Sequence, residues 1–115
     1  MYDLEERTLN LAVAVRNFSQ LLPKTLSNYE DAKQLIRSSG SVGANYIEAN
    51  GALGRKDFFM RIRISRKEAK ETIYWLNIIL KTNNLNPEIK SKGDALIKET
   101  GEIRNIFSAI LKKSV

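Results

Sequence analysis

The chain has 115 residues, enough for one domain with a single hydrophobic core, and 43% of them are hydrophobic. It contains no cysteine and no histidine, which excludes disulfides, thiolate or imidazole metal sites, and histidine-based catalytic triads. The formal net charge of +6 favours an anionic partner. The first residues are acidic and no apolar run approaches the ~20 residues of a membrane span. We therefore expect a cytoplasmic protein without a membrane role.

Apolar residues recur at helical spacing along the chain, and no stretch alternates as a β-strand does. The first predicted helix covers residues 4–22 and ends at Pro23, because proline terminates a helix. The second begins near Tyr29 and continues to about residue 49. Their core stripes are Leu4, Thr8, Leu11, Val15, Phe18 and Leu22, and then Ala32, Leu35, Ser39, Val42, Tyr46 and Ala49.

The third predicted helix begins near Lys56 and ends at residues 83–84. The fourth begins with Asn86 as its N-cap and Pro87 at its first helical position. Their stripes are Phe58, Ile62, Ser65, Ala69, Ile73, Leu76 and Leu80, and then Ile89, Gly93, Leu96, Thr100, Ile103, Phe107 and Ile110. Four amphipathic helices with short connections predict an all-α fold, an antiparallel up-and-down four-helix bundle, with residues 1–115 as one domain.

A stretch rich in glycine, residues 38–54, has three interpretations. A phosphate-binding P-loop needs a different glycine spacing after a strand, and the strand is missing. A KH-type G-x-x-G loop at 51–54 needs a mixed α/β domain. The interpretation that we favour is structural. Small residues at 38–44 let the second helix approach a neighbour closely, and residues 51–54 form the turn into the third helix.

Basic residues gather in the third predicted helix. Residues 55–70 hold seven basic and two acidic side chains, a net charge of +5 that nearly accounts for the whole imbalance. On a helical wheel five of the seven line one flank, while Arg61 lies on the other. The candidates for phosphate contact, here named the basic flank, are Arg55, Lys56, Arg63, Arg66, Lys67 and Lys70, with Arg37 as a weaker candidate.

The alternative without a binding function is a solvated face whose charges pair with nearby Asp or Glu side chains. Tyr74 is the one aromatic residue near this flank. We therefore expect phosphate contacts with low sequence specificity rather than base stacking.

The third helix also carries apolar residues on the face opposite its core stripe. They are Met60, Ile64, Trp75 and Ile78. A helix of a monomeric four-helix bundle needs one apolar stripe, so a second apolar face predicts a subunit interface. Self-association would place several basic flanks side by side and multiply weak phosphate contacts.

Two segments also carry a family resemblance. The first, residues 41–49, reads SVGANYIEA. The second, residues 66–76, reads RKEAKETIYWL, and KDFF at 56–59 precedes it. They resemble the small four-helix-bundle proteins encoded in intervening sequences of bacterial 23S ribosomal RNA genes. The family hallmark reads roughly S-[IV]-x-x-N-I-A-E-G. Ser41, Asn45 and Glu48 match it, whereas Tyr46, Ile47 and Ala49 depart from it.

The resemblance implies an antiparallel four-helix bundle, a homopentameric ring and no enzymatic activity. Related members act as accessory proteins of diversity-generating retroelements, where they bind nucleic acid and a reverse transcriptase. From the residues themselves, we interpret Asn45 and Glu48 as structural rather than catalytic.

Three functions follow as hypotheses. The first is a non-enzymatic, oligomeric protein that binds structured RNA or another nucleic acid through the basic flank, with RNA favoured over DNA. The second is an interaction scaffold for another protein, for example a reverse transcriptase. The third, an enzyme that uses carboxylates and Mg²⁺, is disfavoured because the thirteen Asp and Glu residues do not converge on one face. We therefore expect no catalytic residue, metal or cofactor.

Overall fold

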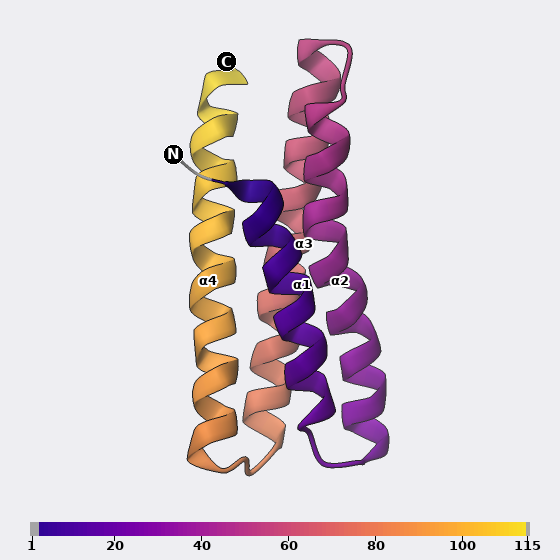
Figure 1. Ribbon diagram of the computed structural model, residues 1–115, viewed down its shortest axis with the longest axis vertical. Coiled ribbons are helices and arrows are strands. Elements are labelled where there is room, and N and C mark those ends of the chain that lie inside the picture. The colour runs from indigo at the N-terminus through magenta and orange to yellow at the C-terminus, as the bar shows by residue number, and fades with distance from the viewer. Residues whose placement is uncertain (1–2, 115) are drawn as a thin grey trace.

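The computed structural model describes residues 3–114 and forms a four-helix bundle (Figure 1). The elements are α1 (Leu4–Gln20), α2 (Leu26–Asn50), α3 (Arg55–Thr82), α4 (Pro87–Leu111) and a short 3₁₀ helix, η1 (Lys112–Ser114). The helices alternate in direction along a body of 46 × 24 × 21 Å. α1 packs on α2 and α4, and α3 packs on the same two helices. The predicted antiparallel up-and-down bundle is confirmed, with α1 and α3 diagonally opposed.

Side-chain caps fix where three of the helices begin. Asp3 caps α1 by accepting a hydrogen bond from the backbone N–H of Glu6 at 3.1 Å. Asn86, which precedes Pro87, caps α4 by accepting one from the backbone N–H of Ile89 at 2.9 Å. The start predicted for α2, near Tyr29, was too late. Thr25 accepts from the N–H of Asn28 at 3.1 Å, so α2 begins at Leu26.

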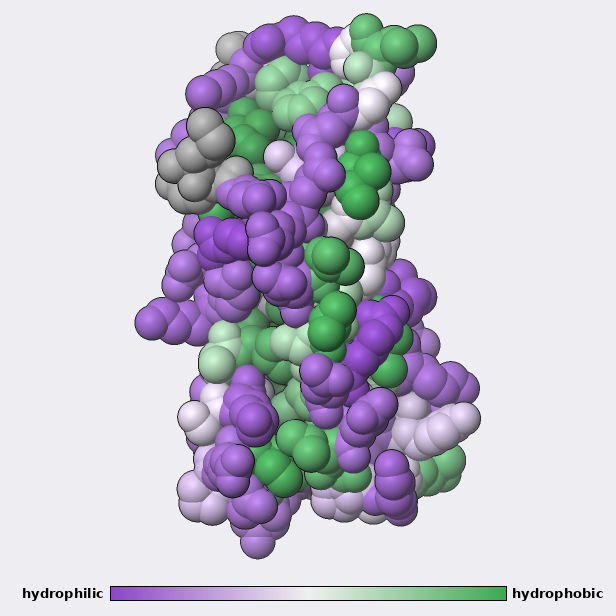
Figure 2. Space-filling view, viewed as in Figure 1, coloured by the Kyte–Doolittle hydropathy of each residue, from purple (hydrophilic) through white to green (hydrophobic). Residues whose placement is uncertain are grey.

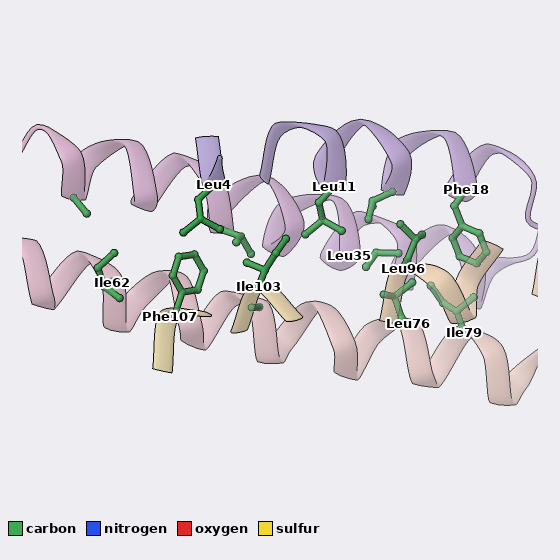
Figure 3. Packing of buried hydrophobic residues seen from close by; sticks show 14 of the residues in the cluster. Leu4, Leu11, Phe18, Leu35, Ile62, Leu76, Ile79, Leu96, Ile103 and Phe107 are labelled. Atoms are coloured by element: carbon green, nitrogen blue, oxygen red, sulfur yellow. The ribbon is translucent and has the colours of Figure 1, made fainter. Parts of the chain in front are cut away.

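The core lies along the bundle axis, where residues of all four helices meet (Figure 3). The stripes predicted for α1 and α4 are buried apart from Ile89 and Ile110, which are half-buried. In α3 the structure buries Phe59, Thr72 and Ile79, where the sequence pattern favoured Phe58, Ile73 and Leu80. These three predicted residues are half-buried, because α3 contacts both α2 and α4 and so covers a broad arc of its surface.

Small residues allow α2 to lie close to its neighbours. A Cβ atom added to Gly43 would lie 2.7 Å from Thr8 Oγ1 of α1. On the α3 side, the Ser65 hydroxyl donates to the carbonyl of Val42 at 3.0 Å. The stretch at 38–43 is therefore a packing surface inside a helix, while Ala44 is exposed. Gly51 and Gly54 bound the turn between α2 and α3. The P-loop and KH interpretations are wrong, because no strand occurs within residues 3–114.

A pair of amides joins the first turn of α2 to the residue that follows α3. Asn28, which is 3% exposed, donates to Asn83 Oδ1 at 2.8 Å, and Asn83 donates back to Asn28 Oδ1 at 2.7 Å. Nδ2 of Asn28 also donates a hydrogen bond to the carbonyl of Pro23 at 3.0 Å. Nδ2 of Asn83 reaches the carbonyl of Ile79 at 2.8 Å. This network holds the start of α2 against the end of α3.

Candidate nucleic-acid interface

The basic flank follows the N-terminal part of α3 and borders two shallow depressions. Arg63, Arg66, Lys67 and Lys70 line one of about 350 Å³. Arg55, Lys56 and Arg63 line another of about 380 Å³, together with Phe59 and Ser114. Arg63 is common to both. The structure thus brings all six predicted residues into one continuous surface.

Contacts with the C-terminal part of α4 and with η1 orient this surface. The guanidinium of Arg55 donates to the carbonyl of Lys113 and lies 4.8 Å from the centre of the Phe59 ring. Arg63 reaches Ser114 Oγ, and Arg66 reaches Ser108 Oγ, each at 3.5 Å. The flank therefore lies on the α4 side of α3. Arg61, on the opposite flank as predicted, donates to Asn45 of α2 at 3.2 Å.

Within residues 3–114 the basic flank is free of direct ion pairs, although Glu71 lines one of its depressions. None of its six residues forms an ion pair with an Asp or Glu side chain in the part of the chain that the structure describes. Four cations elsewhere do form ion pairs, among them Arg7 with Glu99 at 2.6 Å and Lys90 with Asp94 at 3.1 Å. The interpretation of the flank as a face of internal ion pairs therefore does not fit these side chains.

Arg37, the weaker candidate, is engaged elsewhere. Its guanidinium bridges Glu68 at 3.4 Å and Glu71 at 2.5 Å on α3. Burial raises the pKa of the Glu68 carboxyl, although Arg37 partly opposes this effect. Arg37 thus ties α2 to α3 beside the depression that Glu71 lines, and it has less free charge to offer a phosphate.

Sequence reasoning missed cations that the fold adds to the surface. Lys112 and Lys113 are exposed in η1, which follows α4, and the carbonyl of Lys113 accepts the hydrogen bond from Arg55. Antiparallel packing of the last two helices would have placed this end beside the start of α3. Tyr74 is 59% exposed and lines the depression of Arg63 and Lys67. Tyr74 was expected near this flank from the sequence, and its exposed ring lies there beside the cations.

The residues predicted to form a subunit interface differ in exposure. Met60 is 45% exposed, but Ile64 and Ile78 are half-buried. Trp75 was expected on the outer face. The structure instead packs it against the core, with its ring 5.2 Å from that of Tyr74. Self-association through this face stays a prediction, with less exposed apolar surface than the sequence pattern indicated.

The three residues that match the family hallmark are polar side chains of α2. Asn45 donates to the carbonyl of Ser41 at 2.9 Å and to its hydroxyl at 3.0 Å, and it accepts the hydrogen bond from Arg61. Glu48 is exposed. The geometry fits a structural role for Asn45, since its amide connects two turns of α2 to α3.

No group of three or more acidic side chains in residues 3–114 is arranged to hold a metal ion. Over the same residues, no helix is both long and apolar enough to cross a membrane.

Comparison with known proteins establishes the family. The protein-family model described as 23S rRNA-intervening sequence protein matches residues 2–109. The chain belongs to this family. Its fold is also similar to a solved structure from Bacteroides thetaiotaomicron VPI-5482, described as a protein with unknown function from the S23 ribosomal protein family. The two are 31% identical with a TM-score of 0.83, and the match covers 95% of this chain and 98% of that one. No curated protein matches the chain.

Membership in the 23S rRNA-intervening sequence proteins confirms the resemblance stated from residues 41–49 and 66–76. Neither the family description nor that of the solved relative indicates an enzymatic activity.

Proposed function

We propose that this 23S rRNA-intervening sequence protein is a non-enzymatic, oligomeric protein that binds structured RNA through the basic flank. The observation that carries the proposal is that six cations share one surface of α3 without a carboxylate partner in residues 3–114. Unpaired cations in a row are suited to the phosphate backbone, since binding releases counterions condensed on the polyanion.

The dimensions of the surface support this proposal. Residues 55–70 span about 22 Å along α3, at about 1.5 Å per residue. Double-stranded DNA presents roughly one phosphate per 1.7 Å of its axis, counting both strands, so about thirteen phosphates pass over this length, and the shorter rise of an A-form RNA duplex brings no fewer. Half of them lie on the nearer strand, and their number is comparable to that of the cations on the flank. The contact would recognise shape and charge rather than sequence.

The test is fluorescence anisotropy with a labelled RNA hairpin and a DNA duplex, between about 50 and 300 mM salt. Reversing two charges with Arg63→Glu and Lys67→Glu should lower the affinity at least about tenfold and reduce the salt slope by about two. The matched control reverses Lys92 and Lys98, which are exposed on α4 away from the depressions, and so alters the net charge equally.

If both double variants weaken binding alike, net charge rather than the basic flank governs the interaction. If the Arg63 and Lys67 variant keeps the affinity and slope of the natural chain, the flank is not the site. A DNA affinity above that for RNA would contradict the choice of RNA. Light scattering across protein concentrations tests the homopentamer that the family resemblance implies.

A second candidate is a scaffold for another protein, such as a reverse transcriptase. It is favoured by exposed apolar residues on α1, Leu9 at 62% and Val13 at 50%. Figure 2 shows hydrophobic side chains on the face where α1 lies in front. Because α1 is diagonal to α3, a protein bound there would leave the basic flank free. A protein that co-purifies after nuclease treatment, and is lost on Leu9→Glu, would support the scaffold.

A further inference from the structure

A cleft of about 650 Å³ lies between the C-terminal half of α1 and the N-terminal half of α2. The connection from Leu22 to Thr25 contributes to its lining. Its volume is within the range of about 300–1,000 Å³ that is usual for small-molecule sites, and helical bundles bind such ligands between their helices. Since the cleft is formed by α1 and α2, it is separate from the basic flank of α3.

The lining of this cleft is largely apolar. Ala32 and Ile36 of α2 lie among its lining residues, together with Leu22 and Pro23 of the connection. Two further lining side chains are mostly in contact with water. They are Leu26, which is 80% exposed, and Tyr29, which is 68% exposed. An apolar ligand would remove this surface from water, which is the main source of affinity in such sites.

The charged residues of the cleft are all of one sign. Arg16, Lys24 and Lys33 line it, and none of the lining residues is acidic. Glu30, outside the lining, pairs with Lys33 at 3.0 Å, and this contact raises the pKa of Lys33. Arg16 donates to the carbonyl of Ala12 at 3.0 Å, which leaves further N–H groups for a ligand. Lys24 has no carboxylate partner within residues 3–114.

We propose that this cleft binds an amphiphilic anion, with an apolar chain against the lining of α1 and α2 and a carboxylate or sulfonate beside Arg16 and Lys24. The cations of the cleft favour a negatively charged head group, because opposite charges attract. The apolar lining favours an apolar chain, because a buried polar group would need hydrogen-bond partners there. The inference does not depend on RNA binding, since no residue of the basic flank contributes to the cleft.

Isothermal titration of the full chain with decanoate, below its micellar concentration, tests the proposal. One decanoate should bind per chain, and octanoate, which is two methylenes shorter, should bind about fifteenfold more weakly, because each buried methylene changes affinity about fourfold. Decyltrimethylammonium, with the same tail and opposite charge, should bind at least tenfold more weakly than decanoate. Equal affinities for the two head groups, or for the two chain lengths, would overturn the proposal.

Two pairs of variants locate the site. Ala32→Phe fills the cleft and should lower decanoate affinity more than tenfold, whereas Ala44→Phe, at an exposed position of the same helix, should leave it unchanged. Lys24→Glu, in the exposed connection, should weaken binding about tenfold, and Lys92→Glu on α4 should not.

Circular dichroism checks that each variant is folded. If Ala32→Phe does not fold, the decanoate affinity of Lys24→Glu tests the proposal by itself. If Ala32→Phe alters the oligomeric state while decanoate affinity stays the same, the cleft is a protein interface and the proposal fails. Unchanged RNA affinity in the cleft variants would show that the two sites are independent.

Discussion

Two glycines of α2, three residues apart, should respond oppositely to the same substitution. In Gly43→Ala the new methyl group would lie 2.7 Å from Thr8 Oγ1 and 3.0 Å from Thr8 Cβ. In Gly40→Ala the nearest atom would be Arg16 Nη2 at 3.6 Å, the far end of a flexible side chain. The first contact forces α1 and α2 apart, and the second is ordinary van der Waals packing.

The magnitudes follow from these contacts. Replacing glycine by alanine inside a helix stabilises it by about 0.5–1 kcal/mol, and Gly40→Ala should gain this amount in full. In Gly43→Ala the same gain is opposed by about 1–3 kcal/mol of overpacking. The Thr8 hydroxyl donates to the carbonyl of Leu4 at 2.6 Å, and displacing it costs about 1 kcal/mol more. The net loss for Gly43→Ala should be about 1–3 kcal/mol.

Denaturant unfolding at one fixed protein concentration measures the free energies, because self-association would make stability depend on concentration. In thermal unfolding the two variants should differ by about 6–16 °C, since 1 kcal/mol corresponds to about 4 °C at this chain length. Equal stabilisation by both substitutions would refute the close approach of α1 and α2 at Gly43.

Three further predictions concern polar contacts. Asn28→Ala should lower the free energy of unfolding by about 1–3 kcal/mol, because it removes a buried amide and leaves the half-buried amide of Asn83 without one of its partners; an unchanged denaturation midpoint would contradict this. Arg7→Ala should cost at most about 1 kcal/mol in low salt and less in high salt, since Arg7 and Glu99 are partly exposed; a cost that does not vary with salt would argue against an electrostatic origin. The raised pKa of Glu68 means that the folded chain binds this proton more tightly than the unfolded chain, so stability due to this group falls as pH rises above 4.5. Glu68→Gln should flatten that fall in the melting temperature, and a steeper fall would reverse the assigned sign.

Much of the fold follows from residue spacing, and the errors have physical causes. The stripe of α1 and the Asn86–Pro87 start of α4 could be predicted because local pattern and final structure agree there. The first turn of α2 was missed because Leu26 and Tyr29 are exposed, so the core stripe does not mark it. Trp75 was misplaced because a helical wheel cannot tell how wide an arc the neighbouring helices cover.

The candidate site divides in the same way. The six cations of the basic flank could be predicted together because they lie on one helix, whose geometry is known in advance. The ion pair of Arg37 with Glu71 depends on the register between α2 and α3, which one sequence does not determine. The addition of Lys112 and Lys113 depends on which end of α4 lies beside Arg55.

The two ends of the bundle differ in their side-chain hydrogen bonds, and this affects where local opening begins. At one end Thr25, Asn86 and the Asn28–Asn83 pair fasten the helix termini with side-chain hydrogen bonds. At the other, α3 begins after Gly54 without a side-chain cap. Amide hydrogen exchange should therefore be faster at the start of α3 than at its end, because local opening begins where fewest bonds must break. Arg55 already joins α3 to the carbonyl of Lys113. A polyanion that contacts both side chains would reinforce this link, and RNA binding should then slow exchange at the start of α3.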